Sequence, residues 1–145
     1  MHLTKFSDYS LRVLMLAAAR PGERLTIDDT AAVFGISNGH LKKVVLALTK
    51  AGLLRGIKGR TGGFELARPP AEINLGAVLR ITEPGFKVFE CFADGATCPM
   101  AGPCRLPGIA SKAVQGFLAA FDAVTLADAA VPYDDFRHAL FPLPS

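Results

Sequence analysis

All three cysteines of this 145-residue chain lie within one short segment, at Cys91, Cys98 and Cys104. Six residues separate the first pair and five separate the second, and the intervening residues include two glycines and two prolines. Glycine and proline favour a turning backbone, which can point several sulfur atoms toward one centre. The residue types and their spacing therefore suggest a metal site in a loop over residues 90–105.

The cysteines alone leave the chemistry of this loop open. An intramolecular disulfide would leave one thiol over, and all three thiols belong to one local loop, so a disulfide framework is disfavoured. Zinc and iron-sulfur clusters take four ligands, which leaves one position for another residue or a small molecule. The spacing does not match the four-cysteine patterns of ferredoxins. Zinc, a cluster, thiol redox chemistry and three thiols without a cofactor remain alternatives.

The charges of the chain are distributed unevenly. Residues 1–70 carry 11 lysines and arginines against 5 acids, whereas residues 71–145 carry 5 against 8, and the net charge is +3. Between Ser37 and Arg68, seven basic residues face the single acid Glu65. Such clustering is typical of a surface that binds the phosphates of a nucleic acid.

The same basic half contains a predicted helix-turn-helix. Thr26 opens a helix, Gly35 ends it, and Ser37 caps a second helix whose apolar residues keep helical spacing up to Gly52. The small Ala31 allows the two helices to approach each other.

Side chains at the start of the second helix could reach the bases and phosphates of double-stranded DNA. Asn38 is the candidate for a base contact, and the lysines are candidates for phosphate contacts. His40 is either a DNA contact or an ordinary surface histidine. The candidate DNA-binding residues of this helix are Ser37, Asn38, His40, Lys42 and Lys43.

Two short strands are predicted over residues 53–57 and 64–67, with a glycine-rich turn between them. The glycines do not match a phosphate-binding loop or a dinucleotide fingerprint, and no helix follows them. A wing hairpin explains both the glycines and the charges, with Lys58, Arg60, Gly62 and Gly63 as candidate DNA-binding residues. The expected fold class is mainly α with a small β-hairpin wing, a winged helix-turn-helix plus a long dimerisation helix.

That long helix is predicted over residues 106–124, where apolar residues recur in alternating steps of four and three. A second apolar stripe runs beside the first, so one stripe can pack on the chain itself and the other on a second subunit. A helix buried within one chain is the alternative, but little chain is left to cover it. The residues expected at the dimer interface are Leu106, Ile109, Ala113, Phe117, Ala120 and Val124.

The other segments connect these sites. We expect a first helix over about residues 7–20, capped by Ser7 or Asp8. From its position alone, Asp8 is expected to have a structural role, because its carboxylate lies at the positive end of the helix dipole. A short helix follows near residues 75–81, and Thr125 to Asp128 form a capping box. The expected divisions are the DNA-binding domain 1–70, the connecting helix and linker 71–89, the cysteine loop 90–105, the dimerisation and cap helices 106–130, and a loosely ordered proline-containing tail 131–145.

Five stretches of the chain resemble the Rrf-two family of winged-helix regulators, and within it a branch of nitric-oxide-sensing repressors. They are LTKFSDYSLRVLM at 3–15, HLKKVV at 40–45, GRTGG at 59–63, the ECF, CP and CRL motifs around the three cysteines, and TLAD at 125–128. The resemblance covers the chain from Met1 to about Ala130.

The resemblance implies that Cys91, Cys98 and Cys104 hold an iron-sulfur cluster, with a 4Fe-4S cluster favoured and a 2Fe-2S cluster as the alternative. It also implies that Asp8 of the partner subunit supplies the fourth ligand, which reverses the structural interpretation of that residue. The chain would then be a homodimeric repressor on near-palindromic operator DNA, and nitric oxide would attack the cluster iron and release the DNA.

Other functions remain as alternatives. A repressor of the same family could respond to iron, cluster status or redox state, and a zinc or thiol module could bind a protein partner without binding specific DNA. We expect no enzyme, because no paired carboxylates and no His/Asp/Ser arrangement are evident. No apolar run approaches about 18 residues and no secretory start is present, so we expect a cytoplasmic protein without a membrane partner.

Overall fold

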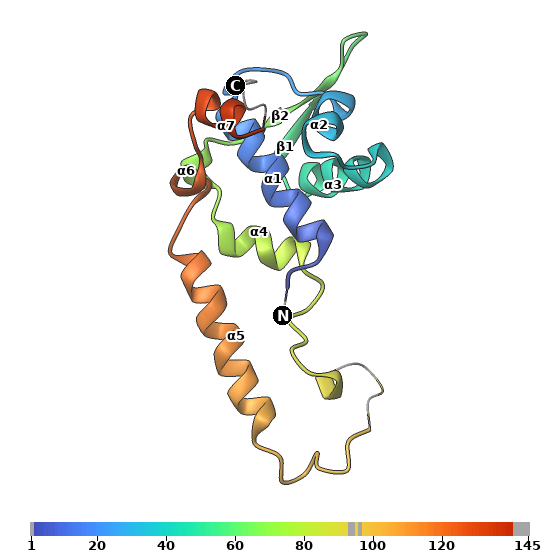
Figure 1. The fold of residues 1–145 in the computed structure, drawn as a ribbon, viewed down its shortest axis with the longest axis vertical. Coiled ribbons are helices and arrows are strands. Elements are labelled where there is room, and N and C mark those ends of the chain that lie inside the picture. The colour runs from blue at the N-terminus through green and yellow to red at the C-terminus, as the bar shows by residue number, and fades with distance from the viewer. Residues whose placement is uncertain (1, 93–94, 96, 141–145) are drawn as a thin grey trace.

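The computed structural model describes residues 2–92, 95 and 97–140 (Figure 1). In these ranges the chain is mainly helical, with one antiparallel two-stranded sheet, as the sequence predicts. The elements are α1 Lys5–Ala19, α2 Ile27–Phe34, α3 Asn38–Lys50, β1 Leu54–Ile57, β2 Gly63–Leu66, η1 Pro70–Glu72, α4 Leu75–Thr82, η2 Glu90–Phe92, α5 Leu106–Asp122, α6 Leu126–Ala129 and α7 Tyr133–Leu140.

Helices α2 and α3 form the predicted helix-turn-helix. The Thr26 side chain caps α2 by accepting a hydrogen bond from the backbone N–H of Asp29 at 3.1 Å. Gly35 ends α2 with φ of 62°, a left-handed conformation that glycine adopts without steric cost. The Ser37 hydroxyl then accepts the backbone N–H of His40 at 3.4 Å, so α3 begins where its cap predicts.

Strands β1 and β2 form the wing hairpin, with Leu54 opposite Leu66 and Gly56 opposite Phe64. The segment between α1 and α2 adds an isolated bridge to the free edge of β2, where Leu25 and Phe64 exchange backbone hydrogen bonds of 2.9 and 2.8 Å. A side chain at Gly63 would collide with the backbone oxygen of Leu25. Gly63 therefore has a structural role in closing the wing onto this segment.

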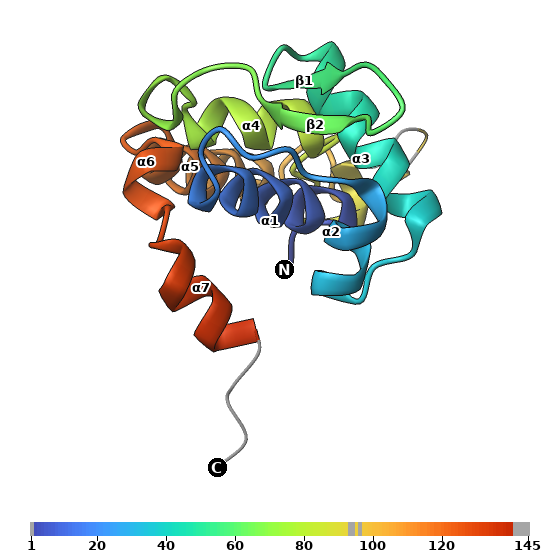
Figure 2. The same ribbon diagram turned by 90° about the horizontal axis from the view of Figure 1, so that it is seen from above.

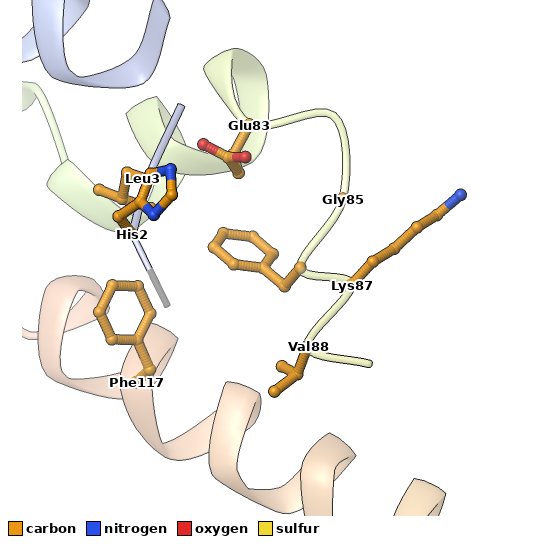
Figure 3. Close-up of a pocket in the computed structure, with 8 residues that line it drawn as sticks. His2, Leu3, Glu83, Gly85, Lys87, Val88 and Phe117 are labelled. Atoms are coloured by element: carbon orange, nitrogen blue, oxygen red, sulfur yellow. The ribbon is translucent and has the colours of Figure 1, made fainter. Parts of the chain in front are cut away.

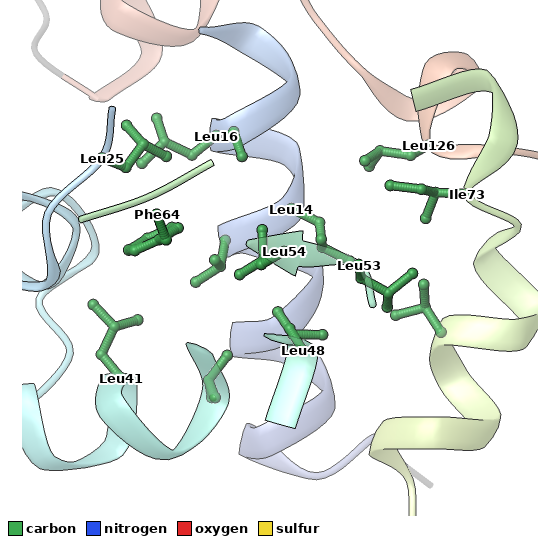
Figure 4. Packing of buried hydrophobic residues seen from close by; sticks show 14 of the residues in the cluster. Leu14, Leu16, Leu25, Leu41, Leu48, Leu53, Leu54, Phe64, Ile73 and Leu126 are labelled. Carbon is green, nitrogen blue, oxygen red and sulfur yellow. The ribbon is translucent and has the colours of Figure 1, made fainter. Parts of the chain in front are cut away.

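The hydrophobic core lies between α1, α3, the hairpin, α4 and α6 (Figure 4). Residues at helical spacing on α1 and α3 supply a large part of it, and Leu126 of α6 belongs to the same cluster. Between residues 83 and 109, none of the described side chains is buried. The largest fully buried side chains are Phe64, Leu14, Leu25, Leu41, Leu48, Leu54, Ile73, Leu79 and Leu126.

Helix α5 begins at the segment that carries the cysteines, at the far end of the molecule, and runs back to this body (Figure 1). Its last turn is fixed to α4, because Arg80 pairs with Asp122 through two bonds of 2.5 and 2.8 Å. The hydrogen-bonded Arg80 guanidinium holds the pKa of Asp122 below its usual value. Gly76 permits this close approach, since a side chain there would overlap the Asp122 carboxylate. No described helix is long and apolar enough to cross a membrane.

The structure corrects two sequence expectations at the chain ends. Helix α1 begins at Lys5 and is capped by Thr4, which accepts the N–H of Ser7 at 3.3 Å, so neither Ser7 nor Asp8 is the cap. The expected tail is wrong for residues 133–140, which form α7 beside α6 at one edge of the molecule (Figure 2). Tertiary contacts hold α7 there: the Phe136 ring lies edge-on to Phe34 with centroids 6.1 Å apart. Residues 141–145 lie outside the described part.

Candidate functional site

The predicted DNA-binding residues of α3 all lie exposed at its first turns. The Ser37 hydroxyl forms two hydrogen bonds with His40, one with its backbone nitrogen at 3.4 Å and one with Nδ1 of its ring at 3.1 Å. The ring of Tyr9 on α1 lies next to the His40 ring, with centroids 6.4 Å apart. The start of α3 is thereby connected to the first turns of α1.

Asn38, the candidate for base contact, has a partner within the chain. Its Nδ2 donates a hydrogen bond of 2.6 Å to Oδ1 of Asp28 in the first turn of α2. Both side chains are exposed, so the amide reaches solvent at the same time. The sequence interpretation gave Asp28 no role.

The predicted phosphate-binding cations are exposed and have no acidic partner in the described ranges. Lys42 and Lys43 lie on α3, and Lys58 and Arg60 lie on the wing turn. Other arginines of the chain do have partners: Arg55, for example, pairs with Glu65 at 2.7 Å across the hairpin. Cations that no carboxylate neutralises keep their full attraction for the phosphates of a nucleic acid.

Arg24 extends this basic surface, and the sequence interpretation missed it. Its exposed side chain lies over the backbone of Gly63, because the bridge between Leu25 and Phe64 brings the α1–α2 segment against the wing. The only sequence signal is the position of Arg24 directly before the buried Leu25. A strand pairing of one residue leaves no periodic pattern that would identify it.

The three thiols are free but are not gathered at one centre. Cys91 is exposed in η2, whereas Cys98 and Cys104 are partly buried. The backbone turns at both, with hydrogen bonds from Ala101 N to Cys98 O at 3.1 Å and from Cys104 N to Met100 O at 3.0 Å. In the described part of the chain, no three side chains of Cys, His, Asp or Glu are arranged to hold a metal ion.

The donor set itself fits a soft metal centre. None of the three thiols is consumed in a disulfide, and sulfur ligands suit zinc and iron-sulfur clusters. They belong to a loop outside the core, in which no described side chain is buried. Residues 93, 94 and 96 of the predicted loop lie outside the described part.

Asp8 lies in the first turn of α1, as predicted, with its side chain 46% exposed. Its carboxylate forms an ion pair of 3.0 Å with Arg12 one helical turn later. It lies in no metal-binding group with the described cysteines of the same chain. A role as a ligand would therefore require a second subunit and would compete with Arg12.

Glu83 connects the start of α1 to the segment that leads into the cysteine loop. Its Oε2 accepts hydrogen bonds from Thr4 N and Thr4 Oγ1, both at 3.0 Å, and from Ser7 Oγ at 2.6 Å. Beside it lies a cavity of about 190 Å³ between the N-terminus, this segment and α5, lined by His2 and Phe117 among others (Figure 3). The sequence interpretation missed Glu83, since 76 to 79 positions separate it from its partners.

The predicted interface residues divide into two groups, and one of these residues, Val124, lies beyond the end of α5 at Asp122. Phe117 and Val124 are partly covered by their own chain, and the Phe117 ring lies 6.1 Å from Phe86 and 5.0 Å from Phe121. Four members are exposed, with Leu106 at 52% and Ile109 at 61%; the group is Leu106, Ile109, Ala113 and Ala120. A helix with large apolar side chains in solvent is typical of a surface that packs on a partner.

Comparisons with known proteins place the chain in a family of transcriptional regulators. A model of the Rrf2 family, described as iron-dependent transcriptional regulator, matches residues 3–131. The HTH-type transcriptional regulator NsrR of Geobacillus kaustophilus is 46% identical over 130 residues, which make up 88% of each chain. NsrR of Bacillus subtilis is 43% identical over 130 residues, covering 88% of this chain and 89% of that one.

Solved structures show the same fold. CymR of Staphylococcus aureus gives a TM-score of 0.67 at 22% identity, covering 85% of this chain and 93% of its own. T. potens IscR gives a TM-score of 0.69 at 21% identity, covering 99% of this chain and 94% of its own. The chain therefore belongs to the Rrf2 family, the same family as the Rrf-two resemblance of its motifs, and it is a DNA-binding transcriptional regulator and not an enzyme.

Proposed function

We propose that this chain is a cytoplasmic, homodimeric repressor that senses nitric oxide through an iron-sulfur cluster. The observation that carries the proposal is that the chain has two separate sets of functional side chains. Unpaired cations lie on α3 and the wing, and three free thiols lie on a loop outside the core. Several relatives that share 40 to 46% of its sequence are named NsrR, which supports the same assignment.

Cys91, Cys98 and Cys104 would hold the cluster, favoured as 4Fe-4S over 2Fe-2S, with Asp8 of the partner subunit as the fourth ligand. When bound, the cluster supplies iron that reacts with nitric oxide. An oxygen ligand holds iron less tightly than a thiolate does, so the Asp8 position is the expected point of attack. To reach it, the Asp8 carboxylate would leave Arg12, its ion-pair partner at 3.0 Å.

The dimer would form through the exposed apolar residues of α5. Two α3 helices related by a two-fold axis would then read half-sites about 34 to 36 Å apart on a near-palindromic operator. In this arrangement Asp8 of one subunit is tied to the cysteine loop of the other. Loss of the tie frees the relative orientation of the two α3 helices, and a small rotation is enough to lose the second half-site.

The absorption spectrum of the anaerobically purified protein, recorded before and after addition of nitric oxide beside a DNA titration at stated salt, tests the proposal. A brown protein that bleaches and releases DNA is the expected result. A colourless protein that contains zinc and binds no specific DNA would overturn the function. A brown protein that keeps its DNA affinity in nitric oxide, but loses it on iron depletion or oxidation, would assign the signal to iron or redox state instead.

Asp8→Ala tests the ligand assignment, with Asp134→Ala as the matched control. Asp134 is also an exposed first-turn carboxylate that pairs with an arginine of its own helix, at 4.0 Å. We expect only Asp8→Ala to change the cluster spectrum, the nitric oxide response and the DNA affinity. Unchanged values of all three would remove Asp8 from the proposal.

A further inference from the structure

The hydrogen bond between Asn38 and Asp28 connects the two helices of the helix-turn-helix on their exposed side. Asn38 is the first residue of α3, and Asp28 lies in the first turn of α2. Their side chains meet at 2.6 Å, from Nδ2 to Oδ1. An acid is unexpected at this position, because the surrounding surface carries unpaired cations and the DNA that it is proposed to bind is an anion.

The bond determines which way the Asn38 amide points. An ionised carboxylate only accepts hydrogen bonds, so the amide atom that faces it must be the NH₂ group. The reverse orientation would place the amide oxygen against the carboxylate oxygen, which is repulsive. With one N–H committed to Asp28, the Asn38 side chain keeps one N–H donor and its Oδ1 acceptor for DNA.

This remaining pair of groups matches one base. Adenine presents the N7 acceptor and the N6 donor in the major groove, and asparagine binds both at once. Guanine presents two acceptors, N7 and O6, in the same places. An asparagine that has one free N–H and its oxygen directed at the base satisfies adenine but sets its oxygen against the O6 of guanine.

We propose that Asp28 is a positioning residue that orients the Asn38 amide and thereby makes α3 select adenine over guanine at one position of each half-site. The inference rests on the proposed DNA-binding function and adds to it a residue that sets base specificity. Asp28 acts through Asn38 and has a second, opposite effect, since its negative charge weakens the attraction to phosphates.

Asp29 provides a matched control for both effects. It follows Asp28 in the same exposed turn of α2, but its Oδ2 accepts a hydrogen bond from Thr26 Oγ1 at 2.7 Å and has no bond to α3. Asp28→Asn and Asp29→Asn therefore remove the same charge at adjacent positions. Asparagine at position 28 can present either its oxygen or its NH₂ group to Asn38, so only that variant loses the fixed orientation.

The test uses the full-length, anaerobically purified homodimer and a library of random duplex DNA from which it selects its preferred site. The affinity is then measured for that site and for each single base-pair change, at one salt concentration. We expect both aspartate variants to bind all duplexes more tightly. Only Asp28→Asn should lose about tenfold in the preference for adenine over guanine at one half-site position, the same position that Asn38→Ala affects.

Each outcome decides the inference. A preference that survives Asp28→Asn, or that falls equally in Asp29→Asn, refutes the positioning role while leaving the DNA-binding function in place. A position-specific loss with Asn38→Ala but not with Asp28→Asn would show that Asn38 reads DNA without Asp28. If the wild-type protein selects no sequence at all, the proposed function itself is wrong and the inference is wrong with it. Equal thermal unfolding midpoints for the two aspartate variants would show that neither effect arises from misfolding.

Discussion

The unpaired cations of α3 and the wing predict a steep dependence of DNA affinity on salt. Lys42, Lys43, Lys58 and Arg60 lack acidic partners in the described ranges, and each is present twice in the proposed homodimer. If each neutralises one phosphate, the slope of log K against log salt is about −7, since each contact contributes about 0.9. Lys58→Ala removes two contacts from the dimer and should reduce the slope to about −5.4.

This difference is large enough to measure by fluorescence anisotropy with a labelled duplex that carries the selected site. Between about 50 and 200 mM salt, the wild-type affinity should fall about 10⁴-fold and the Lys58→Ala affinity about 10³-fold. Lys112→Ala is the control, because Lys112 is also an exposed lysine but lies on α5, the helix that extends away from the DNA-binding body (Figure 1). Its slope should equal that of the wild type.

Two results would refute the reasoning. A Lys58→Ala slope that equals the wild-type slope would show that the wing does not contact phosphates. An equal reduction by Lys112→Ala would show that the slope reports the total charge of the protein and not a defined surface. Because the salt slope counts phosphate contacts only, both results are independent of which bases α3 reads.

Four further predictions concern stability, measured by chemical denaturation. Glu83→Ala should lower the free energy of unfolding by about 2 to 3 kcal/mol, because three hydrogen bonds to its carboxylate are lost. Thr30→Val should raise it by about 1 kcal/mol, because the buried Thr30 hydroxyl has no partner in the described part of the chain. Thr82→Val should lower it, since that hydroxyl donates to a backbone carbonyl at 3.0 Å. Below about pH 4 the wild type should lose stability and Asp122→Asn should lose less, because Arg80 depresses the folded-state pKa of Asp122 and that contribution disappears as the pH falls through it.

Each of these has a result that would contradict it. Glu72 is an exposed glutamate and serves as the control for Glu83. If Glu83→Ala and Glu72→Ala had the same denaturation midpoint, the hydrogen bonds from Glu83 to Thr4 and Ser7 would contribute nothing to stability. A Thr30→Val change of the same sign as Thr82→Val would show that the Thr30 hydroxyl is satisfied. If the free energy of unfolding fell equally with decreasing pH in the wild type and in Asp122→Asn, the acid sensitivity would come from other carboxylates.

The helix-turn-helix could be predicted because its signals are local. Thr26, Gly35 and Ser37 each act within three or four residues, through a cap or a turn, so their neighbours in the sequence suffice to place the helices. The wing hairpin was predictable for the same reason. The cap of α1 was misplaced because Ser7, a good cap residue by type, is instead a hydrogen-bond donor to Glu83 in the fold.

The missed parts of the candidate site depend on contacts between distant residues. Arg24 joins the basic surface only because Leu25 pairs with β2, and Asp28 meets Asn38 only after the turn at Gly35 has folded. Helix α7 is held by an aromatic contact between residues more than a hundred positions apart. Residue types and spacing cannot reveal such pairs, because the periodicity of one element carries no information about its partner.

The position of the core limits how a signal at the cysteines could reach α3. In the described part of the chain, no side chain between residues 83 and 109 is buried, so the cysteine loop contributes no side chain to the core of the DNA-binding body. Within one subunit, one link between this segment and α1 is the Glu83 carboxylate at the cap of α1, and α1 in turn touches α3 through Tyr9 and His40. Asp8 lies between these two contacts, one residue before Tyr9 and one after Ser7. A ligand role for Asp8, as proposed above, would act on the same turn of α1 that Glu83 holds by its hydrogen bonds. The proposal would then give a loop outside the core a route to α3 that requires no unfolding.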